Sequence, residues 1–204
     1  MTADEINIRE IYSALNRDWK KKYSYENYLF NLHSKAENTY KHMEFFDRIQ
    51  KNFDHLDRIT IMASSDPVAL CYLIKKYYGS EITIVSDHPI LERIGEFFID
   101  DYGVDVVFKN PMFEDATEQV KDADLVIFPE YEYFVPLDMI KYYDINKNTA
   151  VLHYVSRVNK QNTTEPILSE QDLLDQCSFK EVIDVGKFKT AGTNRNVYYA
   201  MGVK

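Results

Sequence analysis

Short apolar segments alternate with amphipathic ones through the middle of the chain, and this alternation constrains the fold more than any other feature. The apolar segments are rich in Ile and Val and comprise residues 59–63, 82–85, 104–108, 125–128 and 150–155. The amphipathic segments between them comprise residues 68–78, 90–102, 113–121 and 137–143. Several apolar segments are apolar at consecutive positions, which is typical of strands covered by helices on both faces of a sheet. Repeated strand–helix–strand units require a parallel sheet with right-handed crossovers, so we predict an open α/β domain.

The alternation ends in the C-terminal part of the chain. Ser169 is a suitable cap for a helix that runs to about Cys177. We predict that residues 179–188 and 195–203, which follow, are two strands, and a short turn that contains Gly192 separates them. Strands joined by so short a link can only be antiparallel neighbours. We therefore predict parallel strands followed by a helix and an antiparallel hairpin.

The N-terminal part differs from the rest, and we predict that it is helical. Apolar residues recur there at helical spacing, and neither proline nor glycine interrupts them. These residues are Ile8, Ile11, Tyr12, Leu15, Tyr28, Leu29, Leu32, Met43, Phe46 and Ile49. We thus divide the chain into a helical region (1–56) and an α/β domain (57–204). The helical pattern is compatible with a cap on the α/β domain, with a lid over a ligand, and with the arm of a homodimer.

Composition limits the partners and the location of the chain. The 204 residues carry a net charge of −9, with no long basic run beyond Lys20, Lys21 and Lys22. Nucleic-acid binders gain much of their affinity by neutralising phosphates, so this balance favours a small molecule or a protein as partner. No segment approaches the length of a membrane span, and polar residues stand where a signal peptide has its apolar run. We expect a cytoplasmic protein without a membrane segment.

The histidines and cysteines do not indicate a metal centre. Neither the five histidines nor Cys71 and Cys177 have the spacing of metal ligands, and we expect both cysteines to be small core residues. The 16 tyrosines indicate interfaces or the wall of a cleft, because tyrosine is amphipathic.

Polar residues follow the first four predicted strands, each in a loop that contains a proline. The prolines are Pro67, Pro89, Pro111 and Pro129. Ordinary strand-to-helix turns explain them. Such turns do not explain the accompanying polar residues, which are Asp66, Asp87, His88, Asn110 and Glu130. Because ligands bind outside the carboxyl ends of the strands in open α/β sheets, we predict that these side chains converge on one crevice.

The first of these loops, residues 63–66, has the position of a nucleotide-binding loop but contains no glycine. Dinucleotide sites need glycine there so that a pyrophosphate can reach the backbone. Ala63, Ser64 and Ser65 are small but are not glycine, and Asp66 would repel a second anion. The loop therefore argues against a cofactor that contains phosphate.

The residues after the next two strands each have two interpretations. Asp87 is suited to accept hydrogen bonds from both hydroxyls of an adenosine ribose, and it is also a favourable helix cap. Asn110 has the groups to bind an adenine edge, or it is a turn residue. His88 lies on the predicted ligand edge, or it is a turn residue that faces solvent.

From residue 58 to residue 204, this pattern resembles the class I S-adenosylmethionine-dependent methyltransferase family. The resemblance rests on the run of strand–helix units, on the acid Asp87 after the second strand, and on the terminal helix and hairpin. It implies the sheet order 3-2-1-4-5-7-6, a cofactor above the first two strands, and N-terminal helices in a position to cover the substrate. The cofactor-binding residues that it implies are Ala63, Ser64, Ser65, Asp66, Asp87, His88, Asn110 and Phe128.

The chain departs from the family pattern in two places. The glycine-rich loop after the first strand is replaced by residues 63–66. After the fourth strand, Phe128-Pro129-Glu130-Tyr131 stands where the family often has an acidic segment or one like Asn-Pro-Pro-Tyr. The resemblance implies that Glu130 orients a nucleophile or accepts its proton, and that Tyr131 lines the methyl-transfer channel.

Three hypotheses about function follow. The leading one is a methyltransferase, or a related alkyl transferase, that uses S-adenosylmethionine and acts on a small molecule or a protein. The second is a binding or regulatory protein that keeps the fold without the chemistry, which the missing glycines favour. The third is an unrelated α/β enzyme that uses a nucleotide or a sugar nucleotide. We also expect a homodimer to form through the N-terminal helices.

Overall fold

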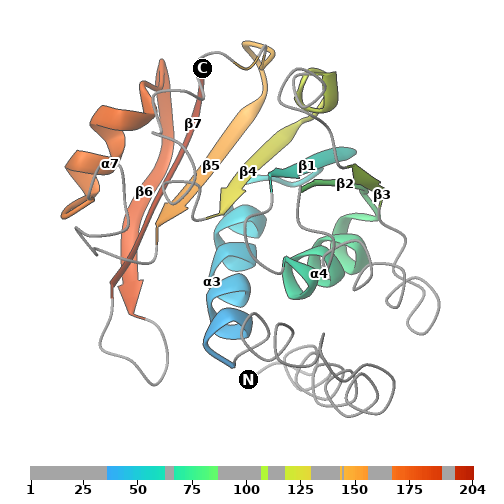
Figure 1. Cartoon of the computed structure of the whole chain (residues 1–204), viewed down its shortest axis with the longest axis horizontal. Coiled ribbons are helices and arrows are strands. Elements are labelled where there is room, and N and C mark those ends of the chain that lie inside the picture. The colour runs from blue at the N-terminus through green and yellow to red at the C-terminus, as the bar shows by residue number, and fades with distance from the viewer. Residues whose placement is uncertain are drawn as a thin grey trace.

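The computed structural model describes residues 36–62, 67–86, 107–109, 118–129, 143, 145–155, 167–189 and 196–204. These residues contain a seven-stranded sheet with the order β3-β2-β1-β4-β5-β7-β6 (Figure 1). The strands are β1 (Arg58–Met62), β2 (Glu81–Val85), β3 (Val107–Lys109), β4 (Leu125–Pro129), β5 (Ala150–Val155), β6 (Glu181–Lys189) and β7 (Asn196–Val203). Strands β1 to β5 are parallel, and β7 is antiparallel to both β5 and β6. The predicted α/β sheet, its strand order and its terminal hairpin are confirmed.

Helices pack on both faces of the sheet. Helices α3 (Ala36–Asn52) and α4 (Val68–Tyr78) share one hydrophobic core with strand residues such as Ile61 and Ile127. Helix α7 (Glu170–Cys177) shares a second core with residues such as Val126. The sheet is therefore the middle layer of three.

Strand β4 shows why the apolar segments are apolar at consecutive positions. All five of its residues are buried. Leu125 and Ile127 face the core of α3 and α4, whereas Val126 and Phe128 face the core of α7. Successive side chains of a strand point to opposite faces, so a strand between two helical layers needs apolar residues at every position.

Local signals end α4 and begin α7. Gly79 follows α4 with a φ of +73°, in the left-handed region that glycine adopts without strain, and its N–H donates to the carbonyl of Lys75. Ser169 precedes α7, and its hydroxyl accepts a hydrogen bond of 3.1 Å from the N–H of Asp172. The predicted helix from Ser169 to Cys177 is thus confirmed with its cap.

The described part of the N-terminal region is one long helix. The prediction of helix is confirmed over α3, while residues 1–35 lie outside the described part of the chain. Phe45 and Ile49 are fully buried in the core that α3 shares with the strands. The boundary at residue 56, the cap, lid and arm interpretations, and the homodimer all stay predictions.

Two expectations from composition can be compared with the described residues. Cys71 and Cys177 are free thiols buried in α4 and α7, as predicted for small core residues. Among the described residues, no helix is long and apolar enough to cross a membrane.

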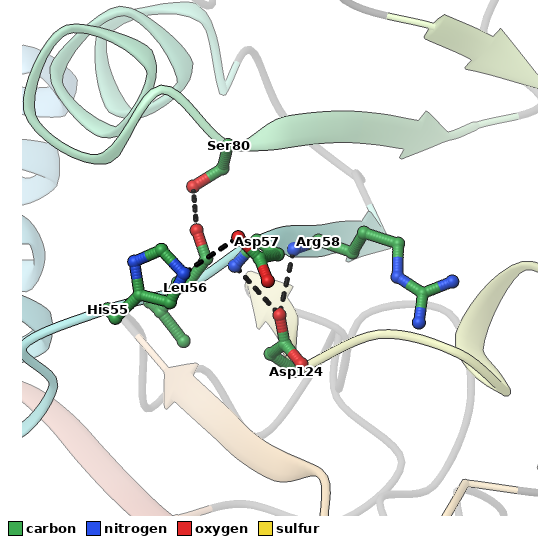
Figure 2. A network of polar contacts seen from close by, with 6 residues as sticks. All are labelled: His55, Leu56, Asp57, Arg58, Ser80 and Asp124. Atoms are coloured by element: carbon green, nitrogen blue, oxygen red, sulfur yellow. Dashed lines mark hydrogen bonds and ion pairs between the residues drawn. The ribbon is translucent and has the colours of Figure 1, made fainter.

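Asp124 holds the amino ends of three strands in register, and Figure 2 shows its contacts with Asp57 and Arg58. Its carboxylate accepts hydrogen bonds of 2.8 and 2.9 Å from the N–H groups of Asp57 and Arg58, at the start of β1. Its own N–H donates to the carbonyl of Arg58, and its carbonyl accepts from the N–H of Ala150, at the start of β5. Nearby, the hydroxyl of Ser80 donates to the carbonyl of Leu56 and links the approach to β2 to the same edge.

We predict that Asp124→Ala lowers the free energy of unfolding by about 1 to 2 kcal/mol, because two backbone N–H groups lose a charged acceptor. Asp124→Asn keeps one acceptor oxygen and should lose less. Urea denaturation followed by circular dichroism measures both. Asp122 is the control, because its side chain is exposed and lies 3.9 Å from Arg58, so Asp122→Ala should change the free energy by less than about 0.5 kcal/mol. Equal losses for Asp122→Ala and Asp124→Ala would contradict the role of Asp124.

Candidate functional site at the carboxyl edge of the sheet

The carboxyl ends of the parallel strands lie side by side on one edge. Met62 of β1 pairs with Val85 of β2, which pairs with Lys109 of β3. Ile61 of β1 pairs with Ile127 of β4, so the ends of β1 and β4 are also adjacent. The strand order reverses between these two strands, and such a reversal is where open α/β sheets bind ligands.

Most of the predicted site residues directly follow these strand ends in the sequence. The last described residues before them are Met62, Ser86, Lys109 and Pro129. The predicted residues themselves, Ala63, Ser64, Ser65, Asp66, Asp87, His88, Asn110, Glu130 and Tyr131, lie outside the described residues. The structure thus brings together the four strands that carry them, and their roles stay predictions.

Helix α4 begins at the same edge. Pro67, which precedes it, is buried and makes no side-chain hydrogen bond that caps the helix. Its first turn contains no acidic residue. The first N–H groups of a helix lack partners within the helix and carry partial positive charge. The edge therefore offers backbone donors beside the reversal point.

Phe128 is the one predicted site residue within the described part of the chain. Its side chain is fully buried, and its ring stacks on the imidazole of His153 with 4.9 Å between ring centroids. The ring centroid of Tyr143 lies 6.0 Å from that of Phe128. Phe128 therefore supports the edge from within the core of α7, and its predicted contact with a cofactor remains untested.

Three residues near this edge were not identified from the sequence. Tyr154 pairs with Pro129 across β5 and β4. Phe45 of α3 stacks on the Tyr154 ring with 3.8 Å between centroids, and the Lys41 ammonium lies 5.7 Å from the centroid of the same ring. Lys41 is only 3% exposed. The first half of α3 is thus packed against the carboxyl end of β5.

Comparison with known proteins gives similarity in structure and none in sequence. No protein-family model matches the sequence, and no curated protein matches it significantly. A precorrin-6y C5,15-methyltransferase from Geobacter metallireducens is similar over 80% of this chain and 87% of its own, with a TM-score of 0.57 and 10% identity. A SAM dependent methyltransferase from Aquifex aeolicus is similar over 81% of this chain and 98% of its own, with a TM-score of 0.51 and 12% identity.

The chain has the fold of the class I S-adenosylmethionine-dependent methyltransferases. At this level of identity the likeness concerns the fold alone. A third similar structure is MtNAS in complex with MTA and tNA, with a TM-score of 0.58 and 14% identity. That likeness covers 97% of this chain and 75% of MtNAS, so it extends further along the chain than the other two.

Two histidines are buried in the methyltransferase fold, one on each face of the sheet. His42 of α3 is fully buried, and His153 of β5 is 1% exposed. Loss of solvation, with a smaller contribution from the charge of Lys41, lowers the pKa of His42 to about 3. Loss of solvation, with a smaller contribution from Lys204, also lowers the pKa of His153 to about 3. Both imidazoles are therefore neutral at physiological pH.

The described part of the methyltransferase fold contains no group of three or more His, Cys, Asp and Glu side chains that could hold a metal ion. Burial raises the pKa of the Cys177 thiol, and burial lowers the pKa of Lys204 to about 8. Both groups belong to the α7 side of the sheet, where Cys177 is part of the core.

We predict that the free energy of unfolding falls as the pH is lowered from about 6.5 toward 3. The unfolded chain binds a proton at each histidine near pH 6.5, whereas the folded chain binds it only near pH 3. The stabilising contribution of each histidine is therefore fully present above its unfolded pKa. Below that pH the free energy of unfolding falls by up to about 1.4 kcal/mol per pH unit for each histidine.

Urea denaturation of His153→Phe at a series of pH values tests this prediction. The variant should lose part of the pH dependence and keep the part due to His42. Phe128→Leu is the control, because it disturbs the same ring stack and removes no titratable group. It should lower stability at every pH and leave the slope unchanged. An identical slope for His153→Phe and the wild-type protein would contradict the prediction.

Proposed function

We propose that this chain binds S-adenosylmethionine at the carboxyl edge of β1, β2 and β4 and transfers an alkyl group from it. One observation carries the proposal, namely the sheet order β3-β2-β1-β4-β5-β7-β6 with its reversal between β1 and β4. The antiparallel β7, inserted between β5 and β6, distinguishes this order from that of an ordinary dinucleotide-binding sheet.

In this proposal the cofactor lies over β1 and β2. The loop 63–66 packs against its amino-acid end, Asp87 accepts hydrogen bonds from the ribose hydroxyls, and His88 and Asn110 contact the adenine side. Each of these residues directly follows a described strand end or its neighbour, and the paired ends of β1, β2 and β3 support their convergence. S-Adenosylmethionine contains no phosphate, so the lack of glycine after β1 is compatible with it.

Alkyl transfer requires little chemistry from the protein. A nucleophile attacks the methyl carbon, the carbon–sulfur bond breaks, and its electron pair neutralises the sulfonium. The protein's main task is to hold the two reactants in line at short range. Glu130 accepts the proton of the nucleophile in this proposal, and Tyr131 lines the transfer path. We choose these two residues because both follow β4 directly in the sequence. The acceptor is a small molecule or a protein side chain.

Calorimetric titration with S-adenosylmethionine and S-adenosylhomocysteine tests the proposal. We expect saturable binding of both, and Asp87→Ala should weaken it by about 10- to 100-fold, as loss of hydrogen bonds to two hydroxyls predicts. Asp175→Ala is the control, since Asp175 is exposed on α7 and bonds only to Gln171 among the contacts described. A folded protein that binds neither ligand, or that binds ATP or NADH instead, would refute the assignment.

A second reaction has specific support. The likeness to MtNAS, crystallised with MTA and tNA, covers 97% of this chain, and another MtNAS structure contains S-adenosylmethionine. The sulfonium has a second transferable group, the 3-amino-3-carboxypropyl arm. Attack of the nucleophile on the terminal carbon of that arm breaks its bond to sulfur and leaves methylthioadenosine instead of S-adenosylhomocysteine.

The nucleoside product distinguishes the two reactions. We predict that incubation of the protein with S-adenosylmethionine and a cell-extract fraction of small molecules, followed by chromatography, yields S-adenosylhomocysteine. Methylthioadenosine above the level of a heat-treated sample would instead establish transfer of the arm. If the cofactor binds and neither product accumulates with small molecules or with whole protein extract, the chain is a binding protein without the chemistry.

A further inference from the structure

We draw no further inference here: the strongest candidate, the surface patch where the exposed ring of Tyr77 in the last turn of α4 packs against Phe46 of α3, carries no proposal because nothing among the described residues shows what covers it.

Discussion

The burial of β4 on both faces is the constraint on which the rest of the structure depends. All of its side chains are enclosed, so it is stable only between two helical layers, and this requires crossovers that return each strand parallel to the last. Parallel strands place all their carboxyl ends on one edge. Asp124 then decides which residues meet there, since it joins the starts of β1, β4 and β5 and so sets Ile61 beside Ile127. The adjacent carboxyl ends at the ligand edge and the hydrogen bonds of Asp124 at the amino edge both follow from the same strand register.

The hairpin at the end of the chain has a different role, because it forms one edge of the sheet. Strand β6 is the last strand in the order, and a free strand edge can pair with another chain. It carries a register shift between Val182 and Asp184, and it carries Lys187 and Lys189 in its second half. A bulge and lysines on an edge strand are two of the features that disfavour such pairing. Lys187 also forms an ion pair of 3.0 Å with Glu170 of α7, which ties the edge to its covering helix.

Much of this fold could be predicted from the sequence because it depends on signals that are local. Consecutive apolar residues located β1, β4 and β5, and a serine cap located α7, all to within about one residue. The strand order came from a family resemblance and not from any residue pattern, since pairing between distant segments leaves no local trace. The burial of Lys41 and His42 was out of reach for the same reason. Both are polar residues on a helix whose apolar positions at Met43, Phe46 and Ile49 were recognised, and the aromatic ring over which Lys41 lies belongs to Tyr154, far away in the chain.

The candidate site was the least predictable part because its chemistry makes small demands on residue type. A sulfonium is already activated, so catalysis depends on position, and position is set by strand register, by the loops that follow, and by the helix that covers them. Asp87 is a favourable helix cap and Asn110 a favourable turn residue, as well as candidate ligand-binding residues. Their identity alone therefore could not decide between a structural and a functional role. The unpartnered imidazole of His42 is different in kind. A turn residue has a structural purpose without a ligand, whereas a fully buried ring with no hydrogen bond lowers the stability of the chain that contains it. His153 carries the same cost on the other face of the sheet, so the lack of a hydrogen bond does not by itself mark a ligand site.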